Sequence, residues 1–399
     1  MTAAPSRTAP SGAGAVLPLL GILVGFEMGV SFFGPLLPQV QQEFEVSAGT
    51  VALALSVYHG SRLVVNLPMA RFVARSVLPV TLGGGGVLFA AGAALVAVAW
   101  VFPAVLAGRA LMGIGAAAFF ITTQLWISKV ATSQNKAQLF SYHQVAALTG
   151  GALGPAIGGA VAGWLSWRWS LVLAAVFGVV ALVAGRRLTD PASGRADGAA
   201  VALPDPDAGL RLGLILGPGL VMMALMFFYG GVTMTLVPLF AARQLHLGPA
   251  AIGGVLTLGT LWRFGAALVG GRLAAWFGIQ RVVVPGLAVL AASVLSFLLV
   301  GSPLGLVVAV SLVSWANLGG SLVVALVTDL VPEPHWGTAL GVNRTMADLG
   351  AMAAPILVGL VIDRYGFDAA IVTVAALLFA AAAAAAALIR SSRRDAVAA

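Results

Sequence analysis

The chain has 399 residues, of which 60% are hydrophobic, 9% are charged and none is cysteine. A soluble domain has about 25% charged residues, so soluble domains of this length could not cover their surfaces with so few charges. The composition therefore predicts an integral membrane protein. The lack of cysteine excludes disulfides, thiolate metal sites and cysteine nucleophiles.

The formal net charge of +8 could indicate a nucleic-acid binder, but the positions of the basic residues indicate membrane topology instead. If the N-terminus is inside, the predicted cytoplasmic segments hold most of the Lys and Arg residues. The predicted outer loops hold Arg168, Arg243 and Arg364. This asymmetry predicts that both termini lie in the cytoplasm.

Twelve apolar runs are long enough, at about 20 residues each, to cross a bilayer as helices. The runs are unbroken, whereas the strands of a membrane barrel alternate over about ten residues, so an all-α membrane fold is expected. In chain order the predicted spans cover residues 15–41, 48–74, 79–100, 103–129, 137–164, 168–188, 211–241, 249–275, 280–300, 303–329, 337–362 and 367–389.

The two halves of the chain are related by an internal repeat with a period of 200 residues. Two glycine pairs, Gly150 with Gly350 and Gly159 with Gly359, follow this period. A duplicated apolar half is typical of secondary transporters, which bind their substrate between the halves near the membrane midplane. We therefore predict two pseudo-symmetric six-helix bundles. The proline pairs that carry the repeat are Pro18 with Pro218, Pro38 with Pro238, Pro103 with Pro303, and Pro155 with Pro355.

One polar segment divides the chain into these two bundles. Residues 186–211 contain four acids and three prolines and are too polar to span a bilayer. We expect five regions, which are a cytoplasmic tail over residues 1–14, a first bundle over 15–188, a cytoplasmic linker over 189–210, a second bundle over 211–390 and a cytoplasmic tail over 391–399.

The fifth predicted helix carries small residues in a regular pattern. Gly150, Gly154 and Gly158 form one stripe, which allows another helix to approach closely. Pro155 removes a backbone hydrogen bond and bends the helix. We expect this bend, with Gly154 and Gly158 beside it, to lie where the two bundles pack.

At these residues and the following Gly159, the chain resembles the major facilitator superfamily. It is similar in particular to the twelve-helix drug:proton antiporters, whose fifth helix carries this glycine–proline signature. In that family a loop after the second helix helps to latch the halves in one state. Here Arg75 remains from the loop's pattern, and the second-half copy keeps Gly271 and Gly278.

Charged residues inside the predicted spans are candidates for proton coupling, because a charge within a membrane is costly and such residues are therefore rare except at functional sites. Glu27 lies about 11 residues into the first helix, near mid-membrane, and is our candidate proton carrier. Arg109 is expected nearby; the alternative is a permanent Glu27–Arg109 ion pair that only joins two helices. Arg344 and Asp348 share one helix face and favour a self-neutralising pair. The alternative is that Asp348 meets Arg75 across the halves.

Other polar and aromatic residues lie on helices that are expected to line the central cavity. Each is individually more typical of packing, His59 included, but together the rings suit a flat or apolar substrate. The cavity candidates are Phe26, Phe33, Tyr58, His59, Arg62, Trp126, Phe227, Tyr229, Trp262, Arg263, Trp315 and Asn317.

The sequence therefore predicts a transporter in a bacterial plasma membrane that acts as a monomer. It would export a small, largely apolar or cationic molecule, such as a drug, and take up protons in exchange. The alternative is a proton-linked importer of a small organic solute; a non-transporting membrane protein is less favoured. The sequence contains no catalytic triad, metal cluster or phosphate-binding loop, so neither an enzyme nor a cofactor is expected.

The predicted orientation can be tested with Ser193→Cys and Ser302→Cys, introduced singly into this cysteine-free chain. Ser302 lies in a predicted outer loop and Ser193 in the predicted cytoplasmic linker. A thiol reagent that does not cross membranes should therefore label Ser302→Cys, and not Ser193→Cys, in intact cells. The reverse pattern would show that the orientation is wrong.

Overall fold

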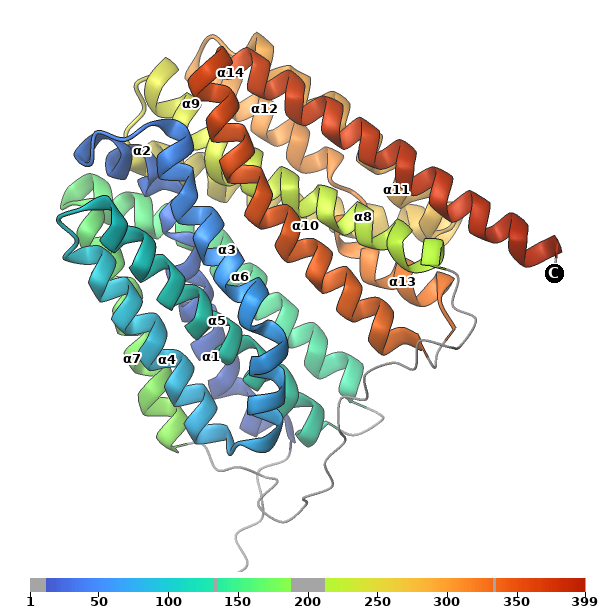
Figure 1. Cartoon of the computed structure of the whole chain (residues 1–399), viewed down its shortest axis with the longest axis horizontal. Helices are drawn as coiled ribbons and strands as arrows, with labels where there is room; N and C mark the ends of the chain where they lie inside the picture. The colour runs from blue at the N-terminus through green and yellow to red at the C-terminus, as the bar shows by residue number, and fades with distance from the viewer. Residues whose placement is uncertain (1–11, 132–134, 188–211, 333–334, 399) are drawn as a thin grey trace, which may run out of the picture.

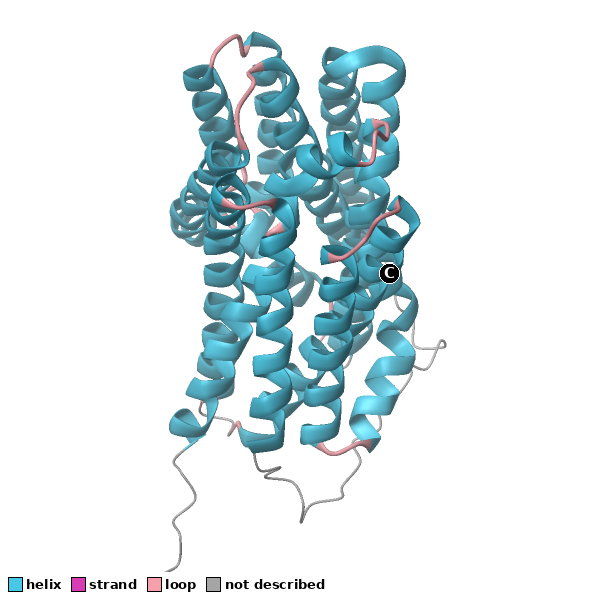
Figure 2. Cartoon of the chain, turned by 90° about the vertical axis from the view of Figure 1, so that its left-hand side faces the viewer, coloured by secondary structure: helices cyan, strands magenta, loops and turns pink. Residues whose placement is uncertain are grey.

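The computed structural model describes residues 12–131, 135–187, 212–332 and 335–398 (Figures 1 and 2). Within these ranges every regular element is a helix and there is no strand. The predicted linker over residues 189–210 and most of the predicted first tail lie outside the described residues.

The first bundle has six spans. Its first span is divided into α1 (Gly12–Ser31) and α2 (Phe33–Glu43). The break lies next to Pro35 and Pro38, which lack the N–H groups that would bond to carbonyls one turn earlier. The other spans are α3 (Ala48–Arg75), α4 (Leu78–Ala97), α5 (Phe102–Val130), α6 (Lys136–Trp164) and α7 (Trp167–Arg187).

The second bundle repeats this plan with more irregular helices. Its first span contains a π-helical stretch, η1, next to Pro238, and its last two spans form one long helix that turns at Gly366. Gly366 has φ 84°, a left-handed conformation that glycine adopts readily. The elements are α8 (Leu212–Phe228), η1 (Tyr229–Leu236), α9 (Val237–Gln244), α10 (Pro249–Phe277), α11 (Ile279–Val294), η2 (Leu295–Leu299), α12 (Pro303–Ala316), η3 (Gly320–Leu322), α13 (Val323–Leu330) and α14 (Trp336–Ala398).

These elements confirm the twelve predicted spans. Ten helical stretches of the described chain are long and apolar enough to cross a membrane, and α14 counts once among them although it holds two spans. The remaining span is α3, which is absent from the ten. It carries His59, Arg62 and Asn66 near its middle, so its hydropathy is lower. The least apolar span thus marks the helix that carries most of the central polar groups. The last helix, α14, continues to Ala398, so residues 391–398 of the predicted tail belong to it.

The two bundles lie side by side and diverge toward one end (Figure 1). We call the end that contains α2 and α9 the sealed end, and the end where α7 stops and α8 begins the linker end. Between the bundles, α6 packs on α10 and α14 packs on α3. Toward the linker end α14 has free space, since a Cβ atom at Gly337 or Gly341 would meet nothing within 4 Å.

The repeat produces a matching pair of close contacts between the bundles. Gly159 of α6 lies against Pro249 of α10, and Gly359 of α14 lies against Gly49 of α3. Both pairs follow the 200-residue period. A Cβ atom at Gly359 would lie 2.6 Å from the Cα atom of Gly49, so the backbones are too close for any larger residue.

The sealed end is also joined by hydrogen bonds to backbone groups. The carboxylate of Asp363 on α14 accepts the N–H groups of Ala48 and Gly49 at 2.8 and 2.7 Å. These are the first two residues of α3, where a negative charge is favourable. The position that matches Asp363 in the repeat is Gly163, which has no carboxylate. These two hydrogen bonds, which we call the Asp363 clasp, therefore exist on one side of the interface only.

A second backbone contact lies beside Pro155. The hydroxyl of Thr257 on α10 accepts the N–H of Ala156 at 3.1 Å and donates to the carbonyl of Ala152 at 2.8 Å. Those two groups belong to α6, four residues apart. The Thr257 hydroxyl therefore bridges a step of the α6 hydrogen-bond ladder from the opposite bundle.

The glycine stripe of α6 does not face the second bundle, in contrast to the prediction from the sequence. Gly154 lies against Met28, and Gly158 against Phe32, so the stripe packs on α1 within the first bundle. A small-residue stripe shows that some helix comes close, but not which one. The neighbouring Gly159, together with the carbonyl of Pro155, is what faces the second bundle. The members of the stripe are Gly150, Gly154 and Gly158.

Leucine substitutions should distinguish packing of α6 on α1, at Gly154, from packing of α6 on the second bundle, at Gly159. Gly154→Leu should lower thermal stability, by the roughly 1–3 kcal/mol typical of overpacking, because its Cβ atom would lie 2.7 Å from Ser31. Gly159→Leu should instead hold the sealed end apart, so that Met234→Cys, buried against Gly34 of the first bundle, reacts faster with a maleimide.

The matched control is Gly84→Leu, because a Cβ atom there would meet nothing within 4 Å. It should change neither the melting temperature nor the reactivity of Met234→Cys. A wild-type melting temperature for Gly154→Leu would contradict the packing role of the stripe.

Candidate functional site

A shared carboxylate joins the two bundles between the sealed end and the linker end. Asp348 of α14 accepts a hydrogen bond from Asn66 Nδ2 of α3 at 2.7 Å. Arg344 Nε of α14 lies 3.6 Å from the same carboxylate oxygen, and the other oxygen lies 3.9 Å from Arg62 Nη2 of α3. We call Arg62, Asn66, Arg344 and Asp348 the Asp348 cluster.

Of the two pairings that the sequence left open for Asp348, the structure shows the one with Arg344, and the one with Arg75 stays a prediction. The Arg344–Asp348 pair is present, and Asp348 also reaches the other bundle, where its partners are Arg62 and Asn66. The side chain of Arg75 lies outside the described residues. Sequence reasoning missed Asn66, although its position one turn after Arg62 on an otherwise apolar span was a usable signal.

The members of the cluster differ in their exposure. The side chains of Asp348 and Arg62 are 5% and 9% exposed, whereas that of Arg344 is 55% exposed. A charged group avoids lipid, so an exposed arginine within a span faces the bundle interior or a water-filled space. Arg344 therefore faces the open space between the bundles on the linker side of the cluster.

Glu27 on α1 lies close to this cluster and not to Arg109. The positive charges that act on it most strongly are those of Arg62 and Arg344. The ion pairs of the described chain join Asp348 to Arg62 and Arg344, and Glu43 to Arg168. The expected alternative of a permanent Glu27–Arg109 ion pair is therefore wrong.

Arg109 is enclosed within the first bundle. Its side chain is almost fully buried, its Nε donates to the carbonyl of Ala54 at 3.1 Å, and its guanidinium lies 4.4 Å from the Phe33 ring and 4.6 Å from the Tyr58 ring. Cation–π contacts of this kind stabilise a desolvated guanidinium. Arg109 thus joins α2, α3 and α5, and the sequence could not show which way it points.

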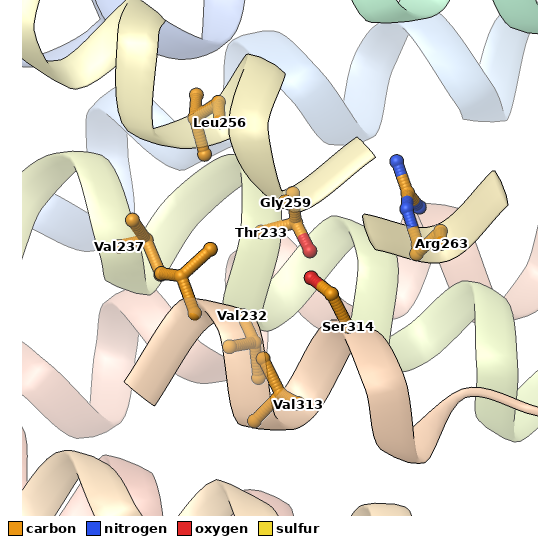
Figure 3. Close-up of a pocket in the computed structure, with 9 residues that line it drawn as sticks. Val232, Thr233, Val237, Leu256, Gly259, Arg263, Val313 and Ser314 are labelled. Atoms are coloured by element: carbon orange, nitrogen blue, oxygen red, sulfur yellow. The ribbon is translucent and has the colours of Figure 1, made fainter. Parts of the chain in front are cut away.

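The second bundle contributes a separate polar group. Arg263 on α10 donates to Thr260 at 2.9 Å, and its guanidinium lies 5.2 Å from the Tyr229 ring in η1. It lines a cavity of about 10 Å³, room for about one water, into which Thr233 and Ser314 direct their hydroxyls (Figure 3). π-Helical stretches such as η1 are rare and frequently lie at functional sites.

The aromatic candidates divide between the bundle interior and more open positions. Phe26 stacks on Phe119 at 4.2 Å and is fully buried, so it packs inside the first bundle and does not line a cavity as expected. Phe33, Tyr58 and Trp126 are also buried there. More accessible are Trp262 and Trp315, which contact each other at 5.8 Å, and the partly buried His59, Phe227, Tyr229 and Asn317.

The remnants of the family loop have mainly local roles. Gly278 ends α10 with φ 88°, a conformation that favours glycine at a helix C-terminus. A Cβ atom at Gly271 would meet nothing within 4 Å. Neither glycine contacts the first bundle among the described residues.

Comparison with known proteins gives one family. The sequence model described as Major Facilitator Superfamily matches residues 19–323 and also residues 220–398. The fold is similar to the crystal structure of a bacterial homolog of the human lysosomal transporter Spinster, in its inward-facing and occupied conformation. The TM-score is 0.78, with 15% identity over 96% of this chain and 98% of that chain. It is also similar to the peptide transporter POT in complex with sulfate. There the TM-score is 0.75, with 16% identity over 98% and 96% of the two chains.

Two curated proteins resemble parts of the chain. The multi-drug resistance efflux pump PmrA homolog of Lactococcus lactis subsp. cremoris is 31% identical over 75 residues, which are 19% of this chain and 63% of that protein. MFS transporter L2 of a Phoma species is 34% identical over 83 residues, 21% of this chain and 14% of that protein. The chain thus matches less than two thirds of the length of either relative.

Asp348→Ala should destabilise the protein more than any loss of a surface acid. It leaves Arg62 unpaired in a buried position, a change that typically costs about 3–5 kcal/mol. The measurement is the melting temperature of the purified protein. Asp368→Ala, which removes an exposed acid of the same helix, is the control and should melt like the wild type. Equal melting of the two variants would show that the Asp348 cluster does not hold the bundles together.

Proposed function

The chain belongs to the Major Facilitator Superfamily, and from this premise we propose that it exports a small, largely apolar molecule in exchange for protons. The observation that carries the proposal is the position of Glu27. It is a partly buried, ionisable carboxyl group on α1, under the electrostatic influence of Arg62 and Arg344 of the Asp348 cluster. No other acid of the described central region is free of a direct ion pair.

Transport would follow from alternating access to the space between the bundles. If the linker end is cytoplasmic, as the charge asymmetry predicts, then the structure has its sealed end outside and its open end inside. Glu27 and Arg344 would then be reached from the cytoplasm. Opening the sealed end would require breaking the Asp363 clasp and separating Gly159 from Pro249.

Protonation of Glu27 would change the balance of charge at the Asp348 cluster. It removes a negative charge that attracts Arg62 and Arg344, so less of the repulsion between the two guanidinium groups is compensated. The relative stability of the open and sealed states would then depend on whether Glu27 carries a proton. This dependence is what couples proton movement to the motion of the bundles.

Two observations support export. Pro155 and the glycines around it resemble the signature of the drug:proton antiporters, and one partial relative is named as a multi-drug resistance efflux pump homolog. Export of an antibiotic would make the cell resistant to it. We expect the protein to act as a monomer in a bacterial plasma membrane.

A second candidate function is proton-linked import of a small organic anion. It is favoured by the exposed guanidinium of Arg344, whose charge would attract an anion. An anion bound beside Glu27 would favour the protonated carboxyl group, so that proton and substrate would move together. An uncharged substrate has no such effect and can exchange with the proton.

Transport into inverted membrane vesicles distinguishes export from import. The vesicles are acidified inside by respiration, and a panel of uncharged apolar antibiotics is screened with a fluorescent pH dye. An exported compound should enter the vesicles and release protons from them, which raises the internal pH. Vesicles without the protein are the control. A compound that leaves preloaded vesicles together with protons would favour import instead.

Glu27→Gln tests the proton carrier directly. Glutamine keeps the size and hydrogen bonding of the side chain but cannot carry a proton. The variant should lose proton-driven transport, by at least about 100-fold, and should still bind the transported compound. Glu45→Gln is the control, because Glu45 is an exposed acid of the sealed end. A wild-type rate and pH dependence in Glu27→Gln would make Asp348 the next candidate.

A further inference from the structure

Arginine side chains outnumber carboxylates in the described interior of the two bundles. With both acids ionised, this interior carries two more positive than negative charges: Arg62 and Arg344 are balanced by Glu27 and Asp348, and the excess comes from Arg109 and Arg263. Charges inside a membrane are costly unless a partner or water compensates them, so an exposed guanidinium in this interior favours a ligand that supplies the missing interactions. Among the described residues the acids are Glu27 and Asp348, and the arginines are Arg62, Arg109, Arg263 and Arg344.

Arg344 is the arginine best placed to meet a ligand. Its side chain is 55% exposed, and its contact with Asp348 is made through Nε at 3.6 Å. Asp348 is already engaged by Asn66 and Arg62. The two terminal nitrogens of Arg344 have no partner among the described residues, so their donors face the space between the bundles.

Aromatic rings lie next to the other arginine of the cluster, Arg62. The guanidinium of Arg62 lies 5.5 Å from the Phe120 ring and 5.8 Å from the Tyr58 ring, on the side of the cluster that belongs to the first bundle. Positive charge and ring surface therefore occur together. A molecule with an apolar body and one polar acceptor would satisfy both.

We propose that this site selects its substrate by charge: Arg344 and Arg62 bind a hydrogen-bond acceptor group, anionic or uncharged, and the site rejects organic cations. The inference rests on the proposed transport function and narrows its substrate class. It removes the cationic substrates that the sequence alone allowed. A guanidinium offers only donors and can give two parallel hydrogen bonds to one acceptor group, whereas a cation would meet like charge and leave those donors unpaired.

Three permanently charged or uncharged naphthalene probes test the selection. Naphthalenesulfonate, methyl naphthyl sulfone and trimethylnaphthylammonium share one aromatic body and differ in the charge of the attached group. Binding of each to the purified protein is measured by calorimetry, without a membrane or a proton gradient. Affinity should fall from the anion to the uncharged sulfone to the cation, with at least about a tenfold difference between the anion and the cation.

Three variants show whether Arg344 causes the selection. Arg344→Gln should weaken sulfonate binding by about tenfold and bring the affinities of anion and cation together. Arg344→Lys, which keeps the charge, should retain most of the preference for the anion. Arg281→Gln is the matched control, because it removes the same charge from an exposed position at the start of α11 and should leave all three affinities unchanged.

Cation binding as strong as anion binding, no measurable binding of the sulfonate, or an unchanged preference in Arg344→Gln would each overturn the proposal. The result is independent of the direction of transport. A protein that prefers the anion but moves no compound in vesicles would contradict the transport function and leave the charge selection standing. A protein that exports compounds but binds the cation best would contradict the charge selection alone.

Discussion

The carboxylate of Asp348 is the interaction on which the central region depends. It lies on α14, yet two of its three partners, Arg62 and Asn66, belong to α3 in the opposite bundle. An arginine can remain within a membrane span only if it is paired or faces water, so the position of Asp348 determines where α3 may carry Arg62. Around this contact the bundles are close on one side and apart on the other. The same charge that holds them together therefore also marks the boundary between the sealed and the open part of the molecule.

The internal repeat explains the packing between the two bundles, whereas several charged residues depart from the repeat. Gly159 and Gly359 make equivalent contacts with α10 and α3, which is what duplication of one half predicts. Asp363, in contrast, has a glycine as its counterpart, and Arg109 has Ala309. The equivalent contacts are packed backbones, whereas the unmatched residues are charged. The repeat thus accounts for the matched helix contacts between the bundles, and the unmatched positions account for the charged groups that only one bundle has.

Much of the fold was predictable from the sequence because hydrophobic length and the repeat of prolines are properties of single helices and of the chain as a whole. The twelve spans follow from them, and so does the close approach of a helix to Gly154. The directions of side chains were not predictable in the same way. The sequence places Arg109 and Glu27 at similar expected depths, but Arg109 is enclosed within the first bundle and Glu27 is under the influence of Arg62. A difference of about 100° around a helix separates such outcomes, and no periodicity fixes it in a helix that is apolar on all sides.

The hydrogen bonds of the Thr257 hydroxyl bear on how α10 and α6 could separate when the sealed end opens. It occupies the N–H of Ala156 and the carbonyl of Ala152, which are also each other's natural partners in an unbroken α-helix. If α10 withdraws, those two groups can bond directly, and the hydroxyl can return to a carbonyl of its own helix, as the hydroxyl of Thr260 does with Leu256. Every polar group keeps a partner, so none is left bare in an apolar surrounding, where an unpaired group is expensive. At this contact, separating the bundles exchanges one complete set of hydrogen bonds for another, so no hydrogen bond has to be lost in either direction.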